Sequence, residues 1–246
     1  MPSLAGKKAF VTGASRGIGA AIARRLAAEG ADVAIGYERS AEAADTLAAE
    51  IRRGGRRAVA VRMSASEPAS VKQAVDRAAS ELGGLDILIN NAGIFRGGPV
   101  EGLTLQEVDE VLAVNVRAVV LASHAALAHL PEGGRIVSIG SNLATRVPDA
   151  GMSLYALSKS ALIGWTQGLA RDLGPRGITV NLVHPGSTDT DMNPADGPQA
   201  AQQAQRMAIK RYGKADDVAA LVAFVAGPQA GSINGAGLTV DGGANA

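Results

Sequence analysis

The stretch that decides the fold reads Ala9-Phe10-Val11-Thr12-Gly13-Ala14-Ser15-Arg16-Gly17-Ile18-Gly19-Ala20-Ala21-Ile22-Ala23. Its apolar start predicts a strand that ends near Thr12, and its alanine-rich end predicts a helix that begins at Gly17. The glycines at 13, 17 and 19 permit a tight turn and close packing of the helix on the strand. Free N–H groups at the start of such a helix attract phosphate. The stretch therefore predicts a phosphate-binding turn, although a plain chain reversal would use the same glycines.

Short β-branched runs alternate with longer alanine-rich segments along the rest of the chain. We expect strands at Ala9–Thr12, Asp32–Tyr37, Ala58–Arg62, Ile87–Asn90, Arg135–Gly140, Thr179–Val183 and Leu238–Val240. We expect helices at Gly17–Glu29, Ala41–Arg53, Pro68–Leu82, Leu105–His129, Leu154–Leu173 and Ala215–Ala226. This alternation is typical of βαβ units, and it predicts one α/β domain over residues 1–246. Its core would be a doubly wound parallel sheet of about seven strands, with helices on both faces.

Residues 187–212 are the least regular part of the chain and are rich in Asp, Asn, Pro and Gln. They follow the sixth expected strand directly. Ligands of open α/β sheets bind at the carboxyl ends of the strands. This position favours a lid or binding loop over a surface excursion.

The composition excludes several kinds of protein. A net charge of +1 gives no general attraction to nucleic acid or to an anionic membrane. The absence of cysteine excludes disulfides, thiol catalysis and cysteine–metal sites, and we expect no metal. Arg117, His124 and His129 interrupt the longest apolar stretch, near Val116–Leu130, so we expect no membrane span. No secretory signal is recognisable at the N-terminus, and we expect a cytoplasmic protein.

The end of the second strand bears on which nicotinamide dinucleotide the turn would bind. An acidic side chain there binds the ribose 2′-hydroxyl, whereas a cation accommodates a 2′-phosphate. The strand ends in Tyr37, Glu38 and Arg39, with no Asp. Arg16 and Arg39 are both placed to reach a phosphate, and Glu38 opposes this unless it faces solvent. The pattern favours NADPH over NADH.

Tyr155 and Lys159 are four residues apart at the start of a predicted helix, which places both on one face. A free tyrosine has a pKa of about 10, and a nearby cation in a partly dry site favours the phenolate. A tyrosine tuned in this way gives a proton to a carbonyl oxygen or takes one from an alcohol. The same spacing also occurs on ordinary helix faces, so the pair alone leaves both interpretations open.

With further motifs the sequence resembles the short-chain dehydrogenase/reductase family, in its 3-oxoacyl-carrier-protein-reductase-like branch. The resemblance covers nearly the whole chain, and the motifs occur in family order. They are Thr12-Gly13-xxx-Gly17-x-Gly19, Asn90-Asn91-Ala92-Gly93, Asn115, Ser141, Tyr155-xxx-Lys159, Pro185-Gly186 and Val240-Asp241-Gly242-Gly243. The resemblance implies a Rossmann-like sheet with strand order 3-2-1-4-5-6-7.

The resemblance also implies a catalytic group and a reaction. Tyr155 would be the acid/base, and Lys159 would bind the nicotinamide ribose and lower the tyrosine pKa. Ser141 would hold the substrate carbonyl. Asn115 would keep a proton-relay water against Lys159. The implied reaction is reduction of a 3-oxoacyl compound or another small ketone by hydride transfer from NADPH.

A larger set of residues would bind the cofactor, with Tyr155 and Lys159 among them. Those expected around its phosphates are Gly13, Ser15, Arg16, Gly17, Ile18 and Gly19. Those expected around its adenosine half are Tyr37, Arg39, Ser64, Asn91, Ala92 and Gly93. Those expected at the nicotinamide are Pro185, Gly186, Thr188 and Thr190.

Three departures from the family pattern affect this interpretation. Ser141 precedes Tyr155 by one residue more than the family spacing, which would select Asn142. We retain Ser141 because it directly follows the strand. Ser64 stands where an Asp commonly meets the adenine amino group. The polar stretch 189–198 does not resemble a channel for a long acyl chain, so a smaller or more polar ketone fits equally well.

Two further expectations concern partners. The fold would also suit a non-catalytic or regulatory protein that binds a signalling dinucleotide. The helices Leu105–His129 and Leu154–Leu173 carry more apolar surface than one sheet face needs, at Leu162, Trp165 and Leu169 among others. In similar proteins these helices pair between subunits, and we expect a homotetramer or a homodimer.

Overall fold

Seven parallel strands form one sheet in the computed structural model, which describes residues 3–246. Their order is β3-β2-β1-β4-β5-β6-β7, as predicted. The strands are β1 (Lys8–Val11), β2 (Asp32–Tyr37), β3 (Ala58–Arg62), β4 (Ile87–Asn90), β5 (Arg135–Ile139), β6 (Thr179–Pro185) and β7 (Gly237–Val240). All seven expected strands are present, and β6 extends two residues beyond its expected end.

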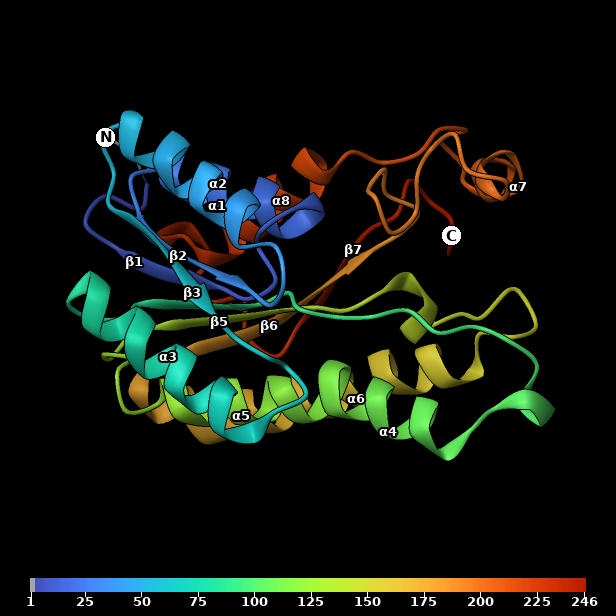
Figure 1. Cartoon of the computed structure of the whole chain (residues 1–246), viewed down its shortest axis with the longest axis horizontal. Helices are drawn as coiled ribbons and strands as arrows, with labels where there is room; N and C mark the ends of the chain where they lie inside the picture. Colours follow the sequence, from blue (N-terminus) through green and yellow to red (C-terminus); the bar gives the residue numbers. More distant parts are fainter. Residues whose placement is uncertain (1–2) are drawn as a thin grey trace.

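Helices cover both faces of this sheet (Figure 1). One layer holds α1 (Gly17–Ala28), α2 (Ala41–Arg53) and α8 (Ala215–Ala226). The other layer holds α3 (Pro68–Leu82), α4 (Leu105–Leu112), α5 (Ala118–Ala126) and α6 (Ser153–Leu173). A hydrophobic core lies on each side of the sheet, so the central strands are buried on both faces.

The prediction of one continuous helix over Leu105–His129 is wrong. A π-helical turn, Ala113–Arg117, separates α4 from α5, and α5 ends at Ala126. The fully buried Asn115 lies in this turn, where its side chain binds the backbone of Ile94. Such bulges inside helices are frequent at functional sites.

Residues 187–212, which we call the lid, are more regular than expected. The lid contains the short helix α7 (Ala200–Arg206). Isolated bridges pair Thr188 with Gly213 and Thr190 with Asn193. The Gln203 side-chain oxygen accepts hydrogen bonds from the side chains of Ser187, Asn193 and Tyr212. These bonds connect both ends of the lid to α7.

Because the strands are parallel, their carboxyl ends lie at one edge of the sheet, where ligands of this architecture bind. The segments that follow β1, β4, β5 and β6 leave from this edge and carry the residues considered below. Within residues 3–246, no helix combines the length and the apolar character needed to cross a bilayer.

Candidate functional site

The glycine turn after β1 has the geometry of a phosphate cradle. Gly13 and Gly17 have φ angles of 62° and 56°, which favour glycine. A Cβ at Gly19 would come within 2.4 Å of the Asn91 amide nitrogen and 2.5 Å of the Gly13 carbonyl. α1 begins without a side-chain cap and without an acidic residue in its first turn. The first N–H groups of α1, beside Ser15, Arg16 and Ile18, are therefore available to an anion.

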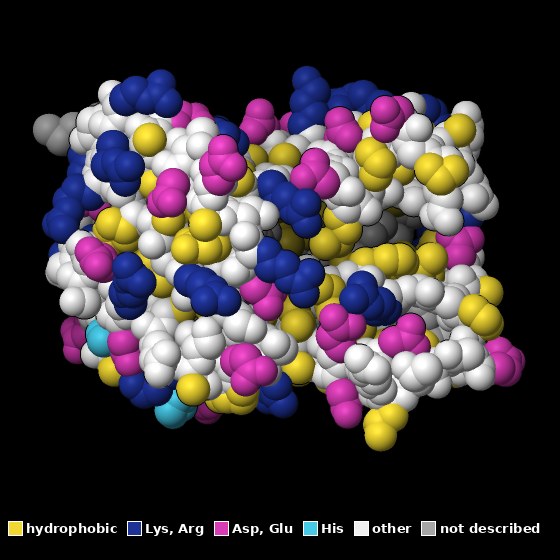
Figure 2. Space-filling model, in the orientation of Figure 1, with side chains coloured by type: hydrophobic (Ala, Val, Ile, Leu, Met, Phe, Trp, Pro, Cys, Tyr) yellow, Lys and Arg dark blue, Asp and Glu magenta, His cyan; other side chains and the backbone are white. Residues whose placement is uncertain are grey.

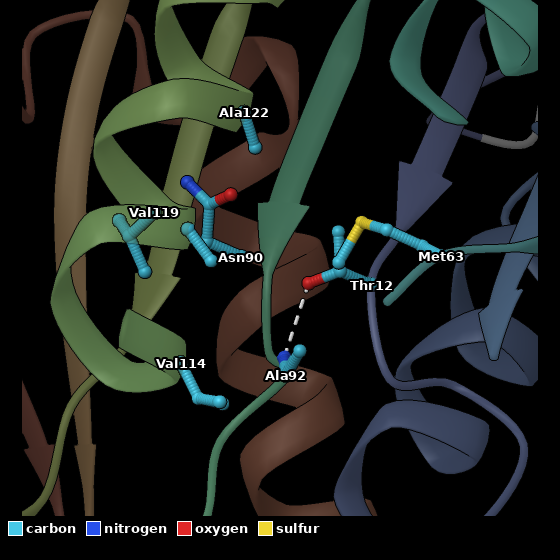
Figure 3. A pocket seen from close by; sticks show the side chains of 8 residues that line it. Thr12, Met63, Asn90, Ala92, Val114, Val119 and Ala122 are labelled. Carbon is cyan, nitrogen blue, oxygen red and sulfur yellow. Dashed lines mark hydrogen bonds between the residues drawn. The ribbon is translucent and has the colours of Figure 1, made fainter. Parts of the chain in front are cut away.

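Thr12 holds the carboxyl ends of β1 and β4 together. Its hydroxyl oxygen accepts hydrogen bonds from the Asn91 and Ala92 N–H groups, both at 3.0 Å. The Asn91 side-chain amide donates to the Thr12 and Gly13 carbonyls, each at 2.9 Å. Figure 3 shows Thr12 directed toward Ala92 beside a cavity of about 10 Å³, too small for an organic ligand. This cavity does not hold a dinucleotide, and Asn91 shapes the turn itself.

The end of β2 presents a cation toward solvent. In the sequence, the negative charge of Glu38 argued against a phosphate at this position. In the structure, Glu38 accepts a hydrogen bond from the Ser64 hydroxyl at 3.2 Å. Arg39 is exposed and forms no ion pair with any of residues 3–246. Tyr37 is half-buried at the strand end. Arg16 contacts Asp191 of the lid at 3.4 Å, with both side chains exposed. An exposed pair of this kind is weak, so Arg16 can exchange its partner for a phosphate.

Tyr155, Lys159 and Ser141 meet where β5 ends and α6 begins. The Lys159 Nζ lies 5.8 Å from the centre of the Tyr155 ring and donates to the Ile139 carbonyl at 2.9 Å. The Ser141 side chain lies close enough to the Tyr155 hydroxyl to affect the pKa of the tyrosine. The structure thus brings the three side chains together, with Ser141 rather than Asn142 beside the phenol.

The pKa of Tyr155 moves in the direction opposite to the one expected. Burial raises the pKa of Tyr155 to about 12, and the neighbouring Ser141 side chain offsets only part of that rise. Burial likewise lowers the pKa of Lys159 to about 8. The ammonium group is directed at the Ile139 carbonyl, so the expected effect of its charge on the phenol is outweighed by burial. Tyr155 is therefore held protonated at neutral pH.

Asn115 and Gly93 lie next to Lys159. The Asn115 side chain accepts from the Ile94 N–H and donates to the Ile94 carbonyl, both at 2.9 Å, and it donates to the Ser158 hydroxyl at 3.0 Å. A Cβ at Gly93 would lie 3.4 Å from both the Asn115 Oδ1 and the Lys159 Nζ. Asn115 is thus fully engaged in fixing the loop after β4 against α6.

The loop after β6 leaves the same edge. Gly186 follows Pro185 at the strand end, and a Cβ there would come within 2.6 Å of the Asp241 Cβ. Thr188 is buried and donates to the Gly186 carbonyl at 3.0 Å. A Cβ at Gly17 would meet the Thr190 methyl group at 3.5 Å, so the lid begins directly over the glycine turn.

Two further residues lie at this site and have no predicted catalytic or cofactor-binding role. Phe95 packs edge-on against Tyr155, with 5.1 Å between the ring centres, and nothing in the local pattern indicates it. His184 is buried with its Nδ1 at 2.8 Å from the Ser141 carbonyl. Burial lowers the pKa of His184, and a carbonyl only accepts hydrogen bonds, so Nδ1 carries the proton. Its place at a strand end was the one available signal.

Among residues 3–246, no group of three or more His, Asp or Glu side chains is arranged to hold a metal ion. The polar groups at this edge are instead hydroxyls, an amide and one ammonium group. Their chemistry suits an organic cofactor and substrate.

A parallel α/β sheet with a glycine cradle, and with a tyrosine, a lysine and a serine at the same edge, defines the class of dinucleotide-dependent oxidoreductases. The family model described as short chain dehydrogenase matches residues 7–201. The chain belongs to the short-chain dehydrogenase family.

Known relatives match over almost their full length. A short chain dehydrogenase from Burkholderia cenocepacia J2315, solved with NADP, is 71% identical, with a TM-score of 0.98 over 99% of this chain and 100% of that one. A blue fluorescent protein from a metagenomic library, solved with NADPH, is 53% identical, with a TM-score of 0.98 over the same shares of the two chains. The cyclic-di-GMP-binding biofilm dispersal mediator protein of Escherichia coli strain K12 is 46% identical over 98% of each chain.

Proposed function

We propose that the protein is a cytoplasmic, NADPH-dependent carbonyl reductase that converts a 3-oxoacyl compound or another small ketone to an alcohol. The observation that carries this proposal is the meeting of Tyr155, Ser141 and Lys159 beside the glycine cradle. Family membership supports an oxidoreductase of this kind.

The choice of NADPH rests on charge and on the relatives. Arg39 is unpaired among the described residues, Arg16 has only a weak exposed partner, and Glu38 is turned toward Ser64. A cation near the end of the second strand accommodates a 2′-phosphate. Structures of two close relatives contain NADP or NADPH. The N-terminus of α1 and its glycines would hold the pyrophosphate.

Each catalytic side chain has a separate task. The Ser141 Oγ accepts from the Leu143 N–H at 3.1 Å, which leaves its own hydrogen to bind the substrate carbonyl oxygen. Tyr155, held protonated by burial, donates its proton to that oxygen. Lys159 has one donor on the Ile139 carbonyl, and its remaining donors would reach the ribose hydroxyls. Bound NADPH supplies the hydride, so ketone, NADPH and a proton give alcohol and NADP⁺.

The Tyr155→Phe substitution tests this assignment. Removal of the proton donor should lower kcat for ketone reduction by about 10²–10⁴-fold. The phenyl ring still packs against Phe95, so the Kd for NADPH, measured by the cofactor's fluorescence, should change less than about threefold. Turnover that is undiminished in the variant would refute the proposal.

A second candidate is a regulatory protein that binds a cyclic dinucleotide. It is favoured by the 46% identity to a relative that is named for cyclic-di-GMP binding. Titration with cyclic-di-GMP, in parallel with a panel of ketones and NADPH, separates the two functions. Tight cyclic-di-GMP binding without turnover of any ketone would favour the regulatory function.

We also propose that copies of the chain associate through α6. Leu162 and Leu169, which were expected to drive pairing, are instead buried in the subunit's own cores, and Trp165 is partly buried against them. The apolar side chains that face outward are Leu157 on α6 and Leu105 at the start of α4, 55% and 76% exposed.

A further inference from the structure

A pocket of about 400 Å³ is lined by Phe95, whose ring contacts that of Tyr155. Its walls come from the loop after β4, from the loop before α6 and from the lid. They consist of Phe95, Gly97, Gly98, Pro99, Ala150, Gly151, Met152 and Gln199. Figure 2 shows the molecule hollowed between the part that carries α7 and the part that carries α4. The volume is in the range of small-molecule sites.

The wall nearest to Tyr155 is apolar and aromatic. Phe95 meets the Tyr155 ring edge-on at 5.1 Å, and Met152 precedes Tyr155 by one helical turn. A Cβ at Gly97 would come within 2.8 Å of the Phe95 ring, so this glycine allows the ring to lie where it does. The Gly98 N–H donates to the Gly151 carbonyl at 2.8 Å, which joins the two loops. A ketone whose oxygen is bound by Tyr155 therefore places its substituent against an aromatic ring and a thioether.

The lining carries no ionised side chain. The neighbouring charges are already paired, Arg96 with Glu110 at 3.0 Å and Arg206 with Asp149. A carboxylate or phosphate in this pocket would lose hydration without gaining a counter-charge. Gln199 is the one polar side chain in the lining. It makes no side-chain hydrogen bond with any of residues 3–246, so its amide is available to a neutral polar group.

From these contacts we propose that the pocket selects uncharged aromatic ketones. The aromatic ring of the ketone lies against Phe95 and Met152. The neutral amide of Gln199 favours an uncharged substituent at the other end of the substrate. This substrate class rests on the proposed reductase function. It disfavours a thioester of a phosphorylated carrier, because the pocket offers no cation to the phosphate.

The first experiment compares three methyl ketones with NADPH: a phenyl ketone, its 4-carboxylate, and a linear alkyl ketone of similar size. We expect kcat/KM for the phenyl ketone to exceed that for each of the others by at least about tenfold. The Phe95→Ala substitution should reduce kcat/KM by about 10–100-fold for the phenyl ketone, and by less than about threefold for the alkyl ketone.

The second experiment is a gain of function, which a misfolded variant cannot imitate. Gln199→Arg supplies the missing counter-charge and should raise kcat/KM for the 4-carboxylate by more than about tenfold. Gln202→Arg adds the same charge to an exposed position on α7 outside the lining and serves as the matched control. Equal responses in the two variants, or equal use of all three ketones, would overturn the proposed substrate class.

A binding measurement separates this inference from the reductase function. Calorimetric titration of the NADPH complex of Tyr155→Phe with each ketone reports the pocket's preference without turnover. If wild type reduces none of the ketones but binding still favours the phenyl compound, the reductase function fails and the preference stands. If ketones are reduced while binding shows no preference, the substrate class fails and the reductase function stands.

Discussion

Lys159 brings its ammonium group into the protein interior, where the residue is only 4% exposed. Among the described residues its one hydrogen-bond partner is the Ile139 carbonyl, at 2.9 Å. No carboxylate of residues 3–246 pairs with this ammonium group, and burial lowers the pKa of Lys159 from 10.5 to about 8. A buried charge of this kind destabilises the fold.

The pH dependence of stability should reveal this cost. The folded pKa of Lys159 lies below its unfolded value, so the unfolded chain binds more protons between pH 8 and 10.5. The penalty is present in full below pH 8 and is relieved as the pH rises through this window. Relative to Lys159→Met, wild type should gain about 3 kcal/mol of unfolding free energy over this range.

Urea unfolding of both proteins at intervals from pH 7.5 to 10.5 measures that difference. Lys210→Met, which removes an exposed lysine, is the control for the loss of a lysine side chain as such. A difference between wild type and Lys159→Met that does not change with pH would show that the ammonium group carries no burial penalty.

Residue patterns predicted part of the site and could not predict the rest. Tyr155 and Lys159 share a helix face by spacing alone, and Ser141 follows from its place after a strand. The edge contact of Phe95 and the bond from His184 to the Ser141 carbonyl join segments far apart in sequence. The rise in the pKa of Tyr155 depends on burial, which the spacing of two residues does not report.

At the scale of elements, the π-helical turn Ala113–Arg117 is the feature that the periodic pattern missed. The apolar period predicts a continuous helix through this region. The turn places Asn115 where its amide binds both backbone groups of Ile94, twenty-one residues away in the chain. A local pattern cannot register such a long-range bond. The helix α7 did have a local signal, since residues 200–206 are strong helix formers, but its polar surroundings obscured it.

The Asn115→Ala substitution should destabilise the protein more than the loss of one ordinary hydrogen bond. It leaves the N–H and the carbonyl of the part-buried Ile94 without their side-chain partner, which costs about 2–4 kcal/mol. Ser158→Ala is the control, because it removes the bond to Asn115 and the Ser158 hydroxyl's bond to the Tyr155 carbonyl but keeps both bonds to Ile94. Its expected cost is about 1 kcal/mol. Urea unfolding measures both, and equal losses would contradict a special role for the turn.

At the scale of the whole molecule, sequence hydrophobicity alone did not predict which apolar residues are buried and which face solvent. The seven strands were predicted correctly from short β-branched runs that alternate with helical segments, and the sheet order followed from the family resemblance. On α6, by contrast, Leu162 and Leu169 face the subunit's own cores, whereas Leu157 faces solvent. When apolar residues occur on both sides of a helix, their spacing alone does not predict which side packs against the sheet.

The outward side of α6 provides the last prediction. Ala161, Gly164 and Gly168 are exposed along the same side of the helix as Leu157, and a Cβ at either glycine would meet nothing within 4 Å. A second helix could therefore approach the backbone closely and cover Leu157. Leu157→Glu would place a charge in that contact and should weaken association by at least about 100-fold.

Light scattering at several protein concentrations measures the mass of wild type and of the variant. Wild type should have the mass of a dimer or a tetramer, and Leu157→Glu that of a smaller species. Val147→Glu is the control, since Val147 is 47% exposed on a loop outside α6 and its substitution should leave the mass unchanged. Burial of Leu157 between copies would stabilise the assembly, whereas an exposed leucine would tolerate glutamate without effect. A monomeric wild type, or a variant that keeps the wild-type mass, would exclude α6 as the interface.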